Sequence, residues 1–125
     1  MAGGAATPAK SQFTTITLQK FTDKASPLLF LNCALGKSIA TAKITFRNIG
    51  GPVPYDYFIV EMAPVFISSF NVDCATGDTG VSETIGLSYT TMKITYQPIA
   101  LSGQLGTPVS ATYSVSKNKA LPDLP

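Results

Sequence analysis

Two glutamates are the side chains best suited to acid–base chemistry in this sequence. Glu61 and Glu83 are its only glutamates, and a pair of carboxylates can act as general acid and general base. Nothing in their spacing places them together. Glu61 interrupts an apolar strand pattern, where a charge also discourages edge-to-edge strand pairing. We therefore favour a structural role for Glu61 over a catalytic one.

Two overlapping serine–lysine pairs have the spacing of a known nucleophile motif. Ser114 with Lys117, and Ser116 with Lys119, both match S-x-x-K. That motif opens a helix in penicillin-binding enzymes and acts with S-D-N and K-T-G segments, which this sequence lacks. Here the matches lie at the end of a strand pattern near the C-terminus. We interpret them as chance matches.

Oxygen-bearing side chains gather in segment 73–80, which could in principle bind calcium. They belong to Asp73, Thr76, Asp78 and Thr79, next to Gly77. The spacing of an EF-hand loop is not met, and no glutamate follows at the required position. A solvated turn is therefore favoured.

The sequence contains no histidine and has two distant cysteines, Cys33 and Cys74. The missing histidine removes the commonest general base, the commonest zinc ligand and the Ser–His and Cys–His nucleophile pairs. Two distant thiols do not make a disulfide scaffold, so both are expected to be reduced and structural. The sequence predicts a protein that is not an enzyme, with no catalytic residues, no cofactor and no metal.

The composition excludes several further classes. Charged residues make up 13% of the 125 residues and apolar residues 45%, which argues against disorder. The net charge of +2, without any block of like charges, gives no footprint for nucleic acid. The apolar run 58–67 is too short and too interrupted for membrane insertion, and residues 1–12 do not resemble a secretory signal peptide. A surface this poor in charge suggests that another subunit covers part of it.

Periodicity predicts strands and one short helix. Residues 13–21 and 42–47 alternate between apolar and polar side chains, as strands do. Over residues 26–35 the spacing becomes helical. Ser26 and Pro27 are typical of an N-cap and first-turn pair, and Gly36 is typical of a left-handed residue just past the helix end.

Two long strand patterns each contain a break. The first, 55–72, contains Pro64, which cannot donate to a ladder and so marks an edge or a bulge. The second, 81–97, changes phase near Thr90, as a bulge at a barrel corner would. A last strand covers residues 109–115. The predicted fold class is mainly β: a small antiparallel β-barrel with one short flanking α-helix, about residues 26–35. The predicted domains are a flexible lead-in (1–12), the barrel (13–118) and a tail (119–125).

Segment 21–37 carries the most specific similarity to a known family. It reads Phe-Thr-Asp-Lys-Ala-Ser-Pro-Leu, then a short helix, then Leu-Gly-Lys. Segments 57–69, 83–97 and 109–117 follow in matching order. Together they resemble the Hcp family (hemolysin-coregulated proteins), the tube proteins of bacterial type VI secretion systems, over about residues 12–118. The family-motif residues are Asp23, Lys24, Ala25, Ser26, Pro27, Gly36 and Lys37.

The resemblance implies a structural subunit and no catalytic motif. Family members form homo-oligomers, hexameric rings that stack into a tube inside a contractile sheath and below a VgrG-type spike. The tube carries small effector proteins in its lumen. The resemblance also implies assembly in the bacterial cytoplasm and later release to the exterior or a target cell without a signal peptide.

In one respect the sequence departs from the family. Members usually carry an additional strand before a glycine-rich segment that residues 1–10 resemble. Either the start is truncated or misassigned, or this member closes its barrel differently. A missing strand would leave an unpaired sheet edge that another chain could fill.

Contacts between subunits are expected from strands for ring closure and from loops 48–54 and 73–80 for stacking. The candidate interface residues are Asn48, Gly50, Gly51, Pro52, Ser68, Asp73 and Gly77. Two other functions stay open. One is a tail-tube protein of a phage or related contractile injection machine. The other is a monomeric β-sandwich binding module that uses its tyrosines as an exposed aromatic strip.

Overall fold

A computed structural model describes residues 13–51, 53–74 and 80–125. The described residues form one helix and nine strands. In chain order these are β1 (Ile16–Phe21), α1 (Ser26–Leu35), β2 (Ser38–Ile39), β3 (Ala42–Asn48), β4 (Tyr55–Met62), β5 (Val65–Cys74), β6 (Val81–Tyr89), β7 (Thr91–Tyr96), β8 (Val109–Ser114) and β9 (Lys119–Leu121).

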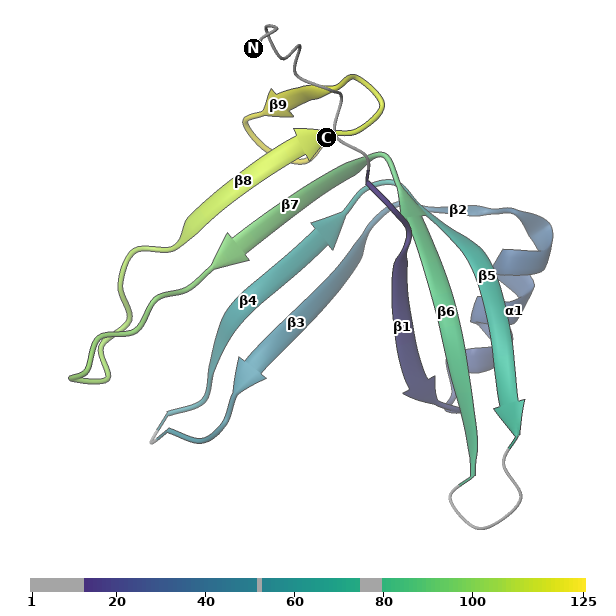
Figure 1. Ribbon diagram of the computed structural model, residues 1–125, viewed down its shortest axis with the longest axis horizontal. Helices are drawn as coiled ribbons and strands as arrows, with labels where there is room; N and C mark the ends of the chain where they lie inside the picture. The colour runs from purple at the N-terminus through teal and green to yellow at the C-terminus, as the bar shows by residue number, and fades with distance from the viewer. Residues whose placement is uncertain (1–12, 52, 75–79) are drawn as a thin grey trace, which may run out of the picture.

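The strands form two antiparallel sheets that meet at a corner. The four-stranded sheet has the order β1-β6-β5-β2, and the five-stranded sheet has the order β3-β4-β7-β8-β9. Figure 1 shows them as the two arms of a V, with α1 alongside β5 on one arm. The chain passes the corner three times with little intervening loop, between β2 and β3, β4 and β5, and β6 and β7. The two sheets are therefore halves of one curled strand arrangement.

The two predicted breaks lie at two of the three corner crossings. Pro64 lies between β4 and β5, and Thr90 lies between β6 and β7. The crossing strands are tied together there, because Ala63 N–H donates to Thr91 O at 3.0 Å and Val115 N–H donates to Thr90 O at 2.7 Å. The apolar alternation shifts by one residue at each break. The apolar side chains before and after the break can therefore face the same core from both arms.

The hydrophobic core sits at this corner. Its buried members are Val60, Met62, Val65, Ile67, Ile85 and Leu87. Leu29 and Cys33 of α1 pack against this cluster, as do Ile16 and Leu18 of β1. The corner therefore holds both sheets and the helix together.

The predicted helix bounds of 26–35 are confirmed, but the predicted N-cap is wrong. Ala25 is the cap residue, and no side chain caps the helix. Instead, the Ser26 hydroxyl accepts a hydrogen bond from the Asp23 backbone N–H at 3.0 Å, which closes the preceding turn. Gly36 is confirmed in the left-handed conformation, with φ of 64° and its N–H directed to the last turn of the helix.

The mainly β class with curled antiparallel sheets and one flanking helix is confirmed. Two short strands, β2 and β9, have no counterpart in the sequence predictions. β9 lies within the predicted tail, residues 119–125, and pairs with β8. Strands of two or three residues are too short to show a period, so pattern alone does not reveal them.

We expect Gly86→Val to lower the free energy of unfolding by about 1–3 kcal/mol, as overpacking of a close contact does. A Cβ at Gly86 would lie 2.5 Å from Ser69 Oγ, 3.0 Å from Ser68 Oγ and 3.2 Å from Thr15 Cγ2. Urea unfolding measures the loss. The matched control is Gly51→Val, where an added Cβ meets nothing closer than 4.0 Å. An equal loss in both variants would contradict the close packing at Gly86.

Candidate functional site

A hydrogen-bonded charge network fixes the turn between β1 and α1. Lys20 Nζ donates to Glu83 Oε1 at 2.9 Å, to Asp23 Oδ1 at 3.0 Å and to Ser26 Oγ at 3.1 Å. Thr22 Oγ1 donates to Glu83 Oε2 at 3.0 Å. Asp23 Oδ1 also accepts the Ala25 N–H at 2.9 Å. The network joins β1, the turn, the first residue of α1 and β6.

The network favours the charged form of each of its ionisable groups. The Glu83 side chain is only 2% exposed, and burial by itself raises the pKa of a carboxyl group. The pKa of Glu83 nevertheless lies below its usual range, chiefly because of hydrogen bonding to the Ser26 hydroxyl and then to Lys20 and Thr22. The hydrogen bond from Lys20 lowers the pKa of Asp23, and the hydrogen bond to Glu83 raises the pKa of Lys20. A buried carboxylate with these partners is held ionised as a structural anchor.

The family-motif residues divide into two sets. Asp23, Ala25 and Ser26 take part in the network by side chain or backbone, and Gly36 ends the helix. Pro27 follows within the first turn, where its missing N–H costs nothing. Lys24 and Lys37 are exposed. Sequence reasoning missed Lys20, Thr22 and Glu83 as partners of the motif, because Glu83 is distant in sequence and only the strand register joins it to Lys20.

The two glutamates lie in different sheets. Glu61 is on β4 of the five-stranded sheet, opposite Lys43 and Lys93, whereas Glu83 is on β6 of the four-stranded sheet. Glu83 is engaged by the network. The arrangement gives no acid–base pair.

The other chemistry-bearing residues have structural roles or lie outside the described residues. Ser114 Oγ accepts the Lys117 N–H at 3.1 Å, which closes the turn after β8. Cys33 and Cys74 are free thiols. Segment 73–80, for which a solvated turn is favoured over a calcium site, falls largely on residues 75–79, outside the described ranges. Within those ranges, acidic, cysteine and histidine side chains form no cluster suited to a metal, and no helix has the length and apolar character to cross a membrane.

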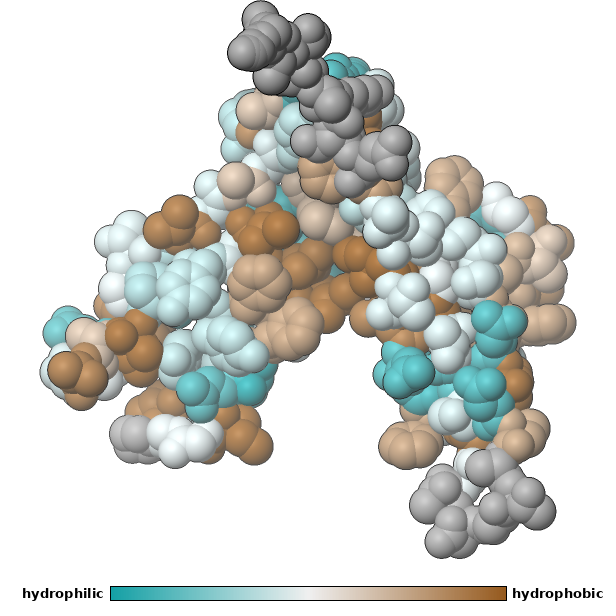
Figure 2. Space-filling view, in the orientation of Figure 1, coloured by the Kyte–Doolittle hydropathy of each residue, from teal (hydrophilic) through white to brown (hydrophobic). Residues whose placement is uncertain are grey.

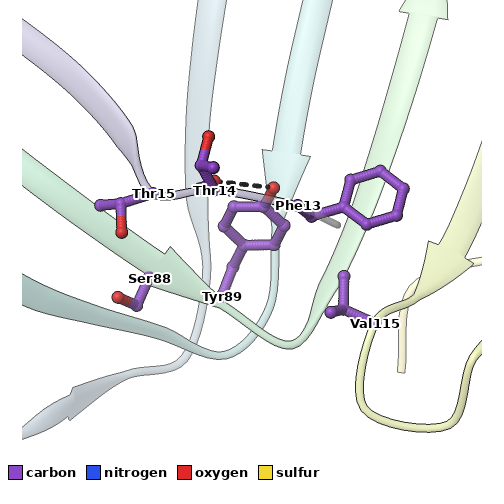
Figure 3. A pocket seen from close by; sticks show the side chains of 6 residues that line it. All are labelled: Phe13, Thr14, Thr15, Ser88, Tyr89 and Val115. Carbon is purple, nitrogen blue, oxygen red and sulfur yellow. Dashed lines mark hydrogen bonds between the residues drawn. The ribbon is translucent and has the colours of Figure 1, made fainter. Parts of the chain in front are cut away.

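A small pocket opens at the corner, where the segment before β1 crosses the end of β6. Figure 3 shows its lining of Phe13, Thr14, Thr15, Ser88, Tyr89 and Val115. Tyr89 Oη donates to Thr14 O at 3.3 Å, and partial burial raises the pKa of the tyrosine. The cavity holds about 80 Å³, well below the several hundred Å³ of typical ligand pockets. It is too small to be a ligand site of ordinary size.

The candidate interface residues lie at separate places. Asn48, Gly50 and Gly51 are exposed at the tip of the five-stranded arm, where Asn48 Oδ1 accepts the Gly50 N–H at 2.9 Å. Asp73 lies at the tip of the other arm, near the end of β5 (Figure 1). Ser68 is exposed at the irregularity within β5. Pro52 and Gly77 lie outside the described residues.

The five-stranded sheet carries an apolar face that sequence reasoning did not single out. Strand register aligns its side chains in three rows across β3, β4, β7 and β8. The rows, from corner to tip, are Ala42, Met62, Met92, Tyr113; then Ile44, Val60, Ile94, Ala111; then Phe46, Phe58, Tyr96, Val109. We call these residues the apolar face. Figure 2 shows apolar residues gathered at the corner and on this arm.

Exposure along the apolar face increases toward the tip. Met62, in the corner row, is fully buried. Phe46, Tyr96 and Val109, in the tip row, are 43%, 51% and 67% exposed. The reverse side of the same strands carries the charged row Lys43, Glu61 and Lys93. A contiguous exposed apolar patch of this kind marks an interaction surface.

This is a mainly β protein with curled antiparallel sheets and one flanking helix. Its exposed apolar face is a surface suited to contacts with other polypeptides. The chain belongs to the Hcp family of type VI secretion: the family model described as "Type VI secretion system effector, Hcp" matches residues 1–96.

Individual relatives agree with the family assignment. The protein Hcp1 of Pseudomonas aeruginosa is 29% identical over 104 residues, which cover 82% of this chain and 64% of that protein. The crystal structure of Hcp1 from Salmonella typhimurium matches with a TM-score of 0.75 and 26% identity, covering 90% of this chain and 76% of the other. A further solved structure, described as a type six secretion system protein, has a TM-score of 0.84 at 23% identity over 90% of this chain and 70% of that one, and supports the fold alone.

The chain spans about two thirds of the length of the Pseudomonas relative, 64% by alignment. The relatives therefore contain polypeptide that has no aligned counterpart here.

Proposed function

We propose that this protein is a structural subunit of the type VI secretion inner tube. Copies form hexameric rings, the rings stack, and the tube carries small effectors out of the cell. The observation that carries the proposal is the family match over residues 1–96, supported by the Salmonella Hcp1 structure at a TM-score of 0.75. The exposed apolar face supplies a surface that assembly would cover.

The partners and location of the proposed subunit follow from the family. They are other copies of the chain, a VgrG-type spike, a contractile sheath and small effectors. The subunit assembles in the bacterial cytoplasm and leaves the cell as part of the tube. The proposed role is structural rather than enzymatic and requires no cofactor, nucleic acid or membrane insertion. A net charge of +2 and the engagement of Glu83 in a structural network support this role.

A tail-tube protein of a phage or related contractile machine shares the same architecture. Genes adjacent to the coding sequence distinguish the two, because a type VI cluster encodes sheath, spike and baseplate proteins of secretion rather than a virion head.

We expect Ser68→Arg to yield a folded monomer where the unaltered protein forms rings. Ser68 is an exposed residue of β5, and an arginine in a closely packed contact between subunits would bury an unpaired charge. Negative-stain electron microscopy distinguishes annuli from small particles, and far-UV circular dichroism checks folding. The matched control is Ser102→Arg, in the exposed loop between β7 and β8. Intact annuli from Ser68→Arg would place β5 outside the ring contact.

A further inference from the structure

The helix α1 is attached to the sheets by few apolar contacts. Three of its four leucines, Leu28, Leu31 and Leu35, are 64%, 46% and 65% exposed, so these side chains bury little surface. Leu29 and Cys33 pack on the core. A segment with few buried apolar contacts is the kind that opens locally while the rest of a protein stays folded.

A hollow separates the start of α1 from the sheet beside it. It holds about 410 Å³, and its lining includes Pro27 and Phe30 of the helix, Phe70 and Val72 of β5, and Glu83 of β6. Phe30 reaches the sheet by an edge contact with Phe70, at a ring distance of 6.0 Å. Packing at the first turn of α1 is therefore incomplete, and other contacts must hold this end of the helix.

The charge network supplies those contacts. Among the described residues, Ser26 makes the only side-chain hydrogen bonds that join α1 to the rest of the chain. Its hydroxyl accepts from Lys20 Nζ at 3.1 Å and from the Asp23 N–H at 3.0 Å. Lys20 Nζ in turn donates to Glu83 Oε1 of β6 at 2.9 Å. One ammonium group therefore joins the first residue of the helix to a buried carboxylate of the sheet.

Two carboxylates balance the charge of Lys20. Asp23 Oδ1 and Glu83 Oε1 lie 3.0 and 2.9 Å from its Nζ. Hydrogen bonding to Lys20 lowers the pKa of Asp23, and hydrogen bonding to Ser26 and then to Lys20 lowers the pKa of Glu83. Both groups are therefore ionised at neutral pH and become protonated only in acid. Protonation removes both ion pairs and leaves the ammonium group without an anion.

The elements packed around the network add no further charge to it. The helix contains no charged side chain. On β5, Val72 is opposite Glu83, whereas the next residue, Asp73, accepts a hydrogen bond from Thr84 at 3.4 Å on the other face of the sheet. Lys24 of the turn is exposed. Within the described residues, no second anion is placed to replace the two carboxylates.

We propose that the network acts as an acid-sensitive latch, which on protonation releases residues 22–37 from the sheets while the sheets stay folded. The segment ends where β1 and β2 pair with β6 and β5. Isolated helices shorter than about 12–15 residues are marginal in water, so the ten residues of α1 should lose helical structure once released. This device goes beyond the proposed tube role and does not depend on ring formation.

The experiment measures the opening of α1 separately from that of the sheets. Amide hydrogen exchange, read by mass spectrometry of peptides, gives the protection of α1 and of β6 at each pH from 7 downward. Glu83→Gln removes the buried charge with little change in shape. Glu61→Gln, which removes the other glutamate from the five-stranded sheet, is the matched control. Lys20→Met removes the ammonium group and replaces Glu83→Gln if that variant does not fold.

The two native thiols give a second readout. Cys33 packs on the core from α1, whereas Cys74 is exposed at the end of β5. A pyridyl disulfide reagent, which reacts with thiols in acid as well as at neutral pH, should therefore label Cys33 only when the helix is released. The labelling rate of Cys33 relative to Cys74 corrects for the effect of pH on the reaction itself.

At pH 7 we expect α1 to exchange about 10–100 times faster in Glu83→Gln than in the unaltered protein, as the loss of charged hydrogen bonds implies. The relative labelling of Cys33 should rise by a similar factor. The Glu61→Gln control should match the unaltered protein in both readouts. As the pH falls, the unaltered protein should lose the protection of α1 while β6 stays protected.

Two results would overturn the proposal and leave the tube-subunit role untouched. Equal protection of α1 and β6 at every pH would show that the helix opens only when the sheets unfold. Unchanged protection of α1 in Glu83→Gln, or an equal loss in Glu61→Gln, would show that the network does not hold the helix in place.

Discussion

Met62→Ala is expected to lower the free energy of unfolding by about 2–5 kcal/mol, the range for truncating a fully buried large aliphatic side chain. Met62 has no exposed surface and is opposite Ala42 on one side and Met92 on the other. It also ends β4 just before the corner, so it contacts the core of both arms. Truncation leaves a cavity that the sheets cannot fill without moving the corner.

Urea unfolding at one protein concentration measures this loss, since assembly makes apparent stability depend on concentration. Met92→Ala is the matched control. Met92 is opposite Met62 in register but only half-buried at the edge of the core, so a smaller loss is expected there. Equal losses from the two substitutions would show that the corner is not the centre of the fold.

Glu83→Gln is expected to destabilise the protein at pH 7 and to weaken its sensitivity to acid. The substitution removes the charge that Lys20 and Thr22 contact from β1 and the following turn. The folded pKa of Glu83 lies below its ordinary value of 4.5. Its contribution to stability is therefore present above pH 4.5 and is lost as the pH falls through the lowered pKa. The stability difference between the two proteins should shrink accordingly in acid.

Thermal unfolding from pH 7 to pH 3 tests the role of Glu83. Glu61→Gln is the matched control, because it removes the other glutamate and leaves the network intact. A constant difference between Glu83→Gln and the unaltered protein across the acid range would contradict an ionised anchor at Glu83.

Lys20 affects stability at the alkaline end of the pH range. Because the folded pKa of Lys20 is raised, its contribution to stability is present below pH 10.5 and is lost as the pH rises through the higher folded value.

Much of the fold could be predicted because its main signals are local. The helix bounds follow from Pro27, Gly36 and the change of period between them. Pro64 and the phase change near Thr90 mark two of the three corner crossings. A proline cannot donate a backbone hydrogen bond to a neighbouring strand, and a one-residue slip moves the following side chains to the other face of a strand.

The features that could not be predicted depend on register between distant strands. Lys20 meets Glu83 only because β1 pairs with β6, and the apolar face exists only because four strands align their alternating residues. The N-cap prediction at Ser26 was wrong for a related reason. The serine hydroxyl has competing partners in Asp23 and Lys20, and a single sequence does not show which partner a side chain takes.

The native mass of the unaltered protein, measured by light scattering on a sizing column, tests the central claim most directly. A hexameric ring of 13.1 kDa chains predicts a species of about 79 kDa, and electron microscopy of that peak should show annuli. A single folded species of about 13 kDa would contradict the tube-subunit account. The exposed aromatic residues Phe46, Tyr57 and Tyr96 would then favour the monomeric binding module.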